Sequence, residues 1–252
     1  MLFTQLIQAN LTTRQLGREI TYYPYTGSTN DDLWELLSDG EAQTGHMVLT
    51  DHQREGKGRQ GRSWYGSAGL GLPFSVLLEP DWPPERLGLI SLAAGVAVGE
   101  ALLDFDVEST LKWPNDVLCK GQKIAGILAE HRSGKIVLGI GINVNEQQAD
   151  FPDDLQASAT SVQLVTGESI QRERLLADII NGLESMLGPF SKDIGARWMA
   201  LCVHVDQAVT FRSGDATVEG IFEGLDDTGH ALINSGNGAV AFSAGDLTLG
   251  DG

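Results

Sequence analysis

The sequence predicts an α+β fold, with a larger first domain of helices and strands and a small second domain of strands. Over 1–203, stretches with helical periodicity alternate with apolar runs of strand length. From about His204 the chain changes to short apolar runs between Gly, Asp and Asn turns, which is typical of a small barrel or sandwich. The 252 residues, 42% of them hydrophobic, suffice for a sizeable core. We therefore expect one domain at 1–203 and a second at 204–252.

The first hundred residues are predicted to supply strands and two helices. Short apolar or β-prone runs predict strands at 21–25, 47–50 and 72–78. A helical pattern follows Gly27, and Ser28 or Thr29 is a natural N-cap for it. The clearest helix is predicted at 84–103, because two prolines open it and leucines recur at helical spacing.

A hairpin and a second long helix are predicted in the next hundred residues. The runs 123–130 and 135–142 carry apolar residues on both faces of each predicted strand, so these strands should lie centrally in the sheet. The polar, acidic stretch 143–159 predicts a mobile loop. Ser169 is expected to cap an amphipathic helix, and 197–201 should end the helical part. In the second domain, strands are predicted at 208–212, 217–222, 231–234 and 239–243.

Composition excludes several classes of function. The chain has 17 Lys and Arg against 34 Asp and Glu, a formal charge of −17, which argues against general binding of nucleic acid. Two cysteines make no disulfide framework, and the five histidines show no catalytic or zinc spacing. We see neither a run of 18 apolar residues nor a signal peptide, so we expect no membrane span and a cytoplasmic location.

One cationic, glycine-rich stretch at 51–64 stands out against this acidic background. Arg54, Lys57, Arg59 and Arg62 alternate there with glycines at 56, 58 and 61. Such glycines let backbone N–H groups converge on an anion. The stretch lacks the spacing of a P-loop. It predicts a loop for a small anion, and the alternative is a flexible, solvated loop.

Four more motifs accompany this loop in a fixed order. They are Gly-Ser-Thr-Asn at 27–30, Lys-Trp-Pro-Asn-Asp at 112–116, Lys-Ile-Ala-Gly-Ile-Leu-Ala-Glu at 123–130 and Gly-Ile-Gly-Ile-Asn-Val-Asn at 139–145. Together the five motifs resemble those of bacterial biotin protein ligases, also called biotin–[acetyl-CoA-carboxylase] ligases. Ser28 comes too early to leave room for the N-terminal DNA-binding domain of some relatives, so the resemblance is to the form without it.

The resemblance implies both a fold and a reaction. The fold would be a mixed sheet flanked by helices, similar to class II aminoacyl-tRNA synthetases, followed by a barrel similar to an SH3 domain. In the reaction, biotin and ATP give biotinyl-5′-AMP and pyrophosphate, and a lysine of a biotin carboxyl carrier protein then takes the biotin. Both steps develop charge on phosphate oxygens, so positioned cations should carry the catalysis.

The resemblance also implies which residues bind biotin. Ser28, Thr29 and Asn30 would contact its ureido ring, with Gln53 adding an amide; capping alone is the alternative for the first two. Lys57, where the family more often has arginine, would wrap the carboxylate together with Gly58 and Arg59. Gly139 and Gly141 would let the strand backbone approach the ligand.

Catalytic and ATP-binding roles follow in the same way. Lys123 would bridge the biotin carboxylate and the α-phosphate, with Arg59 as the second catalytic cation; a solvated strand-edge lysine is the alternative. Further nucleotide contacts are expected from Lys57, Arg62, Trp64, Lys112, Asn115 and Asn143. Trp64 would stack on adenine unless it is a core tryptophan. Asp116 would bind Mg²⁺, and the alternative is that 113–116 is a turn that shapes the floor of the pocket.

Two other functions stay open at this point. One is a lipoate or octanoate ligase or transferase of the same superfamily, against which the cationic loop argues. The other is a non-catalytic biotin-binding module. Expected partners are the carrier protein, biotin and ATP, with no DNA and no membrane, and the sequence leaves a homodimer open.

Overall fold

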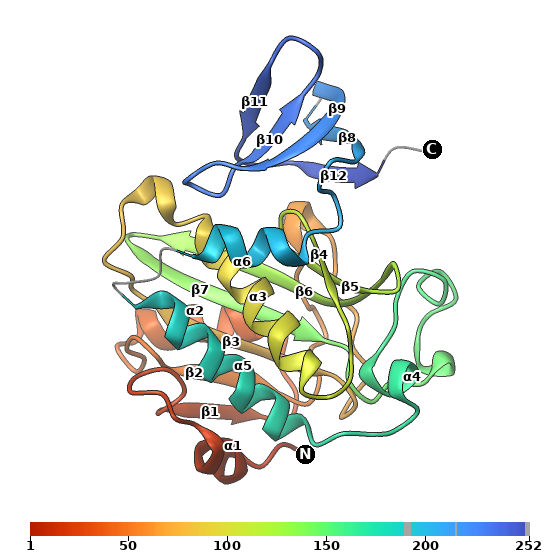
Figure 1. Ribbon diagram of the computed structural model, residues 1–252. Helices are drawn as coiled ribbons and strands as arrows, with labels where there is room; N and C mark the ends of the chain where they lie inside the picture. Colours follow the sequence, from red (N-terminus) through yellow and green to blue (C-terminus); the bar gives the residue numbers. More distant parts are fainter. Residues whose placement is uncertain (189–192, 215, 250–252) are drawn as a thin grey trace.

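The computed structural model describes residues 1–188, 193–214 and 216–249 as a large α+β body that carries a small β-sheet (Figure 1). The body is built on a mixed seven-stranded sheet of order β1-β2-β3-β7-β6-β5-β4. Among its strand pairs in the described part of the chain, only β1–β2 is parallel. The strands are β1 (Ile20–Tyr23), β2 (Met47–Thr50), β3 (Leu72–Leu78), β4 (Thr110–Lys112), β5 (Asp116–Cys119), β6 (Gln122–Arg132) and β7 (Lys135–Ile142).

The hairpin of β6 and β7 forms the centre of the sheet, as the apolar pattern of both strands predicts. β7 pairs with β3 along Leu72–Leu78 and with β6 from Ala125 to Arg132. Alternate side chains along these strands face opposite layers. In β3, Val76 joins the main core while Leu77 joins a second, smaller cluster.

Helices cover the two faces of the sheet unequally. The main core lies under α3 (Leu89–Leu103), α5 (Arg172–Leu187) and α6 (Ile194–Leu201), and α3 packs against both of the other two (Figure 1). On the other face, α2 (Thr29–Ser38) packs Leu33 and Trp34 against β2, β3 and β7. The short helices α1 (Thr4–Asn10) and α4 (Val162–Thr166) lie at the periphery. The N-terminus of α2 is therefore left beside the open part of that second face.

The helical stretch Pro84–Leu103 is a core helix. By length and by its mean hydropathy of 1.6 it could cross a membrane, but 67% of its apolar window is buried inside the protein. Its first turn is a 3₁₀ turn, Pro84–Arg86, and the α-helix begins at Leu89. A Cβ atom on Gly95 would meet Leu111 of the sheet at 3.5 Å, so the helix lies close against the sheet at this point.

The C-terminal sheet contains β8 (Ala208–Ser213), β9 (Ala216–Leu225), β10 (Ala231–Asn234), β11 (Ala239–Phe242) and β12 (Asp246–Leu249). Its order is β11-β10-β9-β8-β12, so among the described residues β11 and β12 are open edges and the expected closed barrel is not seen. The turn between β9 and β10 inserts into the larger body, where Trp113 Nε1 donates to Gly229 O at 3.2 Å. The predicted boundary at 203/204 falls between α6 and β8.

One local expectation was wrong. Ser169 does not cap α5, which begins at Arg172 after the N-cap Gln171. The stretch 143–159, expected as a mobile loop, is hydrogen-bonded to the beginning of β6, where Lys123 N donates to Ser158 O at 2.8 Å and Thr160 N donates to Lys123 O at 3.0 Å; its mobility stays a prediction. Polar composition predicts a loop but not its long-range hydrogen bonds.

Candidate active site

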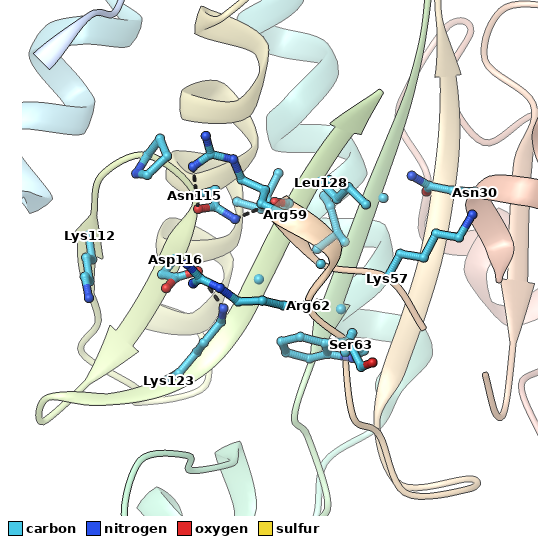
Figure 2. A pocket seen from close by; sticks show the side chains of 18 of the residues that line it. Asn30, Lys57, Arg59, Arg62, Ser63, Lys112, Asn115, Asp116, Lys123 and Leu128 are labelled. Carbon is cyan, nitrogen blue, oxygen red and sulfur yellow. Dashed lines mark hydrogen bonds and ion pairs between the residues drawn. The ribbon is translucent and has the colours of Figure 1, made fainter. Parts of the chain in front are cut away.

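A cavity of about 310 Å³ opens on the face of the sheet that carries α2. Its walls come from the start of α2, the cationic loop, β6, β7 and the 112–116 turn, and Arg212 and Asp246 of the C-terminal sheet close one side. Figure 2 shows that the labelled basic side chains reach this space from several segments. Residues from all five sequence motifs line the cavity, but the end of the last motif, 142–145, does not.

One end of the cavity carries uncharged polar groups. Ser28, Thr29 and Asn30 are 2–3% exposed, and Thr29 donates from its backbone N–H to Gln53 Oε1 at 2.9 Å. Ser28 is the N-cap residue of α2, but its side chain makes no capping hydrogen bond. Its hydroxyl is therefore available to a ligand, and capping alone does not account for the residue.

The other end of the cavity is cationic. Arg59 reaches it from the loop, where Nη1 lies 3.5 Å from Asn115 Oδ1 and 3.3 Å from Gly245 O. Burial lowers the pKa of the Arg59 guanidinium below its ordinary value, with the charges of Asp246 and Asp116 opposing that effect. Arg62 forms an ion pair with Asp246. A phosphate placed here would meet two guanidinium groups already held by the C-terminal sheet.

Lys123 lies at this cationic end, on β6. Its Nζ is 2.6 Å from Asp116 Oδ1 and 5.7 Å from the ring centroid of Trp64. Lys112 also lines the cavity and pairs in register with Asp116 across the β4–β5 hairpin. Figure 2 shows Lys123 and Asp116 pointing toward each other. Lys123 therefore lies on an interior strand and is paired with a cavity residue, and its side chain is 37% exposed.

Lys57 takes a different direction from Arg59. It lines the cavity, but its ammonium group lies 2.5 Å from Asp31 Oδ1 on α2. Both side chains are more than 40% exposed, so this contact is weak and a ligand can replace it. In this structure the Lys57 side chain lies apart from those of Arg59 and Lys123. The backbone of its neighbour Gly58 lines the cavity.

The glycines of the central strands accommodate protein side chains, which the sequence argument did not anticipate. A Cβ atom on Gly141 would lie 2.4 Å from Trp64, and one on Gly126 would lie 2.9 Å from it. A Cβ atom on Gly139 would lie 2.3 Å from Asn30 Oδ1. These glycines thus allow Trp64 and Asn30 to lie on the sheet as walls of the cavity, and Trp64 is only partly buried.

Asn143 lies outside the cavity. It is 4% exposed, and its Nδ2 donates to Thr160 O at 3.0 Å. Its amide therefore stabilises the loop after β7 rather than facing the space in which a nucleotide would fit.

Four residues near the site were missed by sequence reasoning. Asp246 and Gly245 contact the two arginines, Asp31 pairs with Lys57, and Ser75 contacts both Thr29 and Asn30. Asp246 lies in the C-terminal stretch that the resemblance reached only in outline. No spacing in the sequence signals the other contacts, because each joins segments that are distant along the chain.

The chain matches known proteins over both parts. Residues 22–146 match the Biotin/lipoate A/B protein ligase family, and residues 204–250 match the Biotin protein ligase C terminal domain. The chain is 33% identical to the biotin--[acetyl-CoA-carboxylase] ligase of Mycobacterium tuberculosis, over 91% of this chain and 88% of that protein. It is 32% identical to the bifunctional ligase/repressor BirA of Bacillus subtilis, over 97% and 78%.

A solved structure is similar across nearly the whole chain. The biotin protein ligase from Aquifex aeolicus in complex with biotin and ATP superposes with a TM-score of 0.82 at 28% identity, covering 93% of this chain and 100% of that one.

Proposed function

Because this chain belongs to the biotin protein ligase family, we propose that it activates biotin with ATP as biotinyl-5′-AMP and transfers the biotin to a specific lysine of a biotin carboxyl carrier protein. The observation that carries this proposal is the two-ended cavity. Its uncharged polar end suits the ureido ring, and its cationic end suits a carboxylate next to a phosphate.

In the first step, a carboxylate oxygen of biotin attacks the α-phosphorus of ATP, and the bond to the leaving pyrophosphate breaks. Two anions must meet, so the main task of the protein is to neutralise and align them. We assign this task chiefly to Lys123, with Arg62 and Lys112 at the nucleotide, and we assign to Arg59 the holding of the phosphate once biotinyl-AMP has formed. A biotin carboxylate is already deprotonated near neutral pH, so no general base is needed.

In the second step, the uncharged amine of the carrier lysine attacks the carbonyl carbon of biotinyl-AMP. The C–N bond forms, the bond to AMP breaks and the amine loses a proton to solvent. The same cations that hold the α-phosphate then stabilise AMP as the leaving group. Enclosure of the mixed anhydride matters here, because water or any other amine would also attack it.

Mg²⁺ is expected to accompany ATP, and the cavity offers it one carboxylate. Within the described residues no three His, Cys, Asp or Glu side chains form a metal cluster. Asp116 offers one carboxylate at the cationic end, beside Lys123. Mg²⁺ is commonly held by one or two carboxylates together with substrate phosphates, and it would supply further neutralisation of phosphate charge.

The polar end argues against the lipoate or octanoate alternative. An alkyl chain placed there would bury the Ser28 hydroxyl, which makes no capping hydrogen bond, without a partner. Such an unsatisfied group costs about 1–3 kcal/mol. A non-catalytic module would not need four basic side chains at the other end. We therefore favour the ligase.

The direct test offers the purified protein biotin, lipoate or octanoate, each with ATP and Mg²⁺, and measures pyrophosphate. We expect pyrophosphate and biotinyl-AMP with biotin alone, and biotin on the carrier lysine once a carrier domain is added. Turnover with lipoate in place of biotin would support the alternative enzyme. Biotin binding without pyrophosphate would indicate the non-catalytic module.

Location and assembly complete the proposal. We propose a cytoplasmic enzyme that meets its carrier there and does not bind DNA, in keeping with its formal charge of −17. A homodimer is a further prediction, which light scattering of the purified protein would decide.

A further inference from the structure

Neighbours from three different strands hold the side-chain amide of Asn30. Its Nδ2 donates to Glu130 Oε2 of β6 at 2.8 Å, and its Oδ1 lies 2.6 Å from Ser75 Oγ of β3. The absent Cβ of Gly139 on β7 leaves room for Oδ1, since such an atom would lie only 2.3 Å away. Asn30 is 3% exposed, so the amide cannot turn without breaking these contacts.

The chemistry of the two partners decides which way the amide faces. A carboxylate only accepts hydrogen bonds, so the nitrogen of Asn30 must face Glu130. The oxygen then faces Ser75, whose hydroxyl can donate to it. Ser75 Oγ also lies 2.7 Å from Thr29 Oγ1, so this fully buried hydroxyl contacts two of the residues at the uncharged end.

Glu130 is itself directed toward α2. Its Oε1 lies 3.9 Å from Arg132 Nη2, and the Arg132 guanidinium carbon lies 4.5 Å from the ring centroid of Trp34, one turn along α2 from Asn30. Oε2 thus contacts that helix directly, and Oε1 reaches it only through Arg132. The Glu130 side chain is only 26% exposed, which favours one fixed orientation.

We propose that Ser75 and Glu130 are positioning residues that set the affinity of the uncharged end of the cavity by fixing the Asn30 amide. The inference rests on the proposed function, in which that end takes the ureido ring of biotin. Neither residue lines the cavity of about 310 Å³, and Glu130 lines only the adjoining cavity beside the cationic loop. Both therefore act on the uncharged end through Asn30, and Ser75 also acts through Thr29. A cyclic urea has two N–H donors and one carbonyl acceptor. An amide that is held in one orientation offers it one donor and one acceptor at fixed points.

The first test compares Ser75→Ala with the unchanged protein. We expect the Kd for biotin to rise about tenfold, which corresponds to one net hydrogen bond, while the Kd for ATP and kcat at saturating biotin stay the same. Ser109→Ala is the matched control, because the Ser109 hydroxyl is buried without a hydrogen-bond partner. Equal loss of biotin and ATP affinity would indicate general loosening and overturn the proposal, as would unchanged biotin affinity.

The second test is a double-mutant cycle of Asn30→Asp and Glu130→Gln. Alone, Glu130→Gln should weaken biotin binding, because a glutamine lets the Asn30 amide face either way. In the Asn30→Asp background the same change should strengthen binding, since it removes the repulsion of two carboxylates and supplies a donor. Glu79→Gln, at an ion pair with Lys135 outside the cavity, should have no effect in either background.

The cycle separates this inference from the proposed function and from failure to fold. Glu130 is partly exposed, so its variant should fold even if Ser75→Ala does not, and circular dichroism checks this. If Glu130→Gln changes biotin affinity by the same amount in both backgrounds, Glu130 does not position Asn30 and the proposal is wrong. If the unchanged protein does not bind biotin at all, the proposed function fails instead.

Discussion

Nζ of Lys123 lies 2.6 Å from Oδ1 of Asp116, at the cationic end of the cavity. The Lys123 side chain is 37% exposed, and ion pairs at such sites contribute about 0–1 kcal/mol to stability. A lysine ammonium has three donors, so Lys123 can keep Asp116 and still bind two anionic oxygens. The pair therefore orients the Lys123 ammonium group more than it stabilises the fold.

We predict that Lys123→Ala abolishes adenylate formation and leaves the fold intact. Removing one positioned cation should cost roughly 3–4 kcal/mol of transition-state stabilisation, by analogy with oxyanion-hole donors. Pyrophosphate release measures the first effect and a thermal melt the second. Lys135→Ala is the control, because Lys135 makes an ion pair of the same length with Glu79 away from the cavity. Pyrophosphate release within about tenfold of the unchanged enzyme would show that Lys123 does not serve the chemistry.

Gly141→Ala should displace Trp64. The added Cβ would lie 2.4 Å from the indole ring, and Gly141 is paired on both sides, with Pro73 and Gly126, so the backbone has little freedom to move. Overpacking of this kind costs about 1–3 kcal/mol. We expect weaker ATP binding and altered tryptophan fluorescence. Gly195→Ala on α6, where a Cβ meets nothing within 4 Å, should change neither.

The burial of Glu146 predicts that the stability of the folded protein depends on pH. Burial raises its pKa to about 7, Asp150 adds to this, and Arg172 and the backbone hydrogen bonds oppose it. The folded state then holds a proton that the unfolded state releases near pH 4.5, so stability is lost as pH rises from about 4.5 to about 7. Glu146→Gln should remove this loss, which amounts to about 3 kcal/mol.

Denaturant unfolding of both proteins at pH 5 and pH 8 measures the effect. Glu146→Gln should gain on the unchanged protein only at the higher pH, and a constant difference would contradict the assignment. The comparison must be made between variants, because His204 works in the opposite direction. Burial, aided by the charge of Lys112, lowers the pKa of His204 to about 4, so it contributes a loss of stability as pH falls from about 6.5 toward 4.

The sequence predicted elements best where one local pattern decides the structure. The apolar runs of 123–130 and 135–142 placed β6 and β7 at the centre of the sheet, and the glycines and cations of 51–64 marked a wall of the cavity. The start of α5 was predicted wrongly, because Ser169 and Gln171 both stand near it in the sequence and the helix begins only after Gln171. Between them, Ile170 forms backbone hydrogen bonds with the Asn145 side chain, which no local pattern signals.

Contacts between distant segments could not be predicted. Asp246 reaches Arg62 across 184 positions, and Glu130 reaches Asn30 across 100. Asn143 shares a motif with the cavity-lining Gly139 and Gly141, but it turns to the Thr160 carbonyl. A motif places its backbone near a site, and the direction of each side chain depends on what packs beside it.

Arg59 is held from two sides, by Asn115 Oδ1 at 3.5 Å and by Gly245 O of the C-terminal sheet at 3.3 Å. Asn115 is fixed in turn, because its Nδ2 donates to Ile127 O at 2.8 Å. A guanidinium bridging both sheets is well placed to hold biotinyl-AMP after it forms. Lys123 approaches from β6 instead, so the two cations can have different tasks.

We predict that Arg59→Gly still consumes biotin and ATP but releases biotinyl-AMP. A charge-assisted contact contributes about 1.5–3 kcal/mol, or about one to two decades of retention. Free biotinyl-AMP reacts with any amine, so selectivity for the carrier lysine should fall. Two rates on the purified variant decide the matter: pyrophosphate production without carrier, and biotin incorporated into a carrier domain compared with an unrelated protein. If both rates fall together and selectivity is unchanged, Arg59 acts in adenylate synthesis itself, and the division of tasks between Arg59 and Lys123 is wrong.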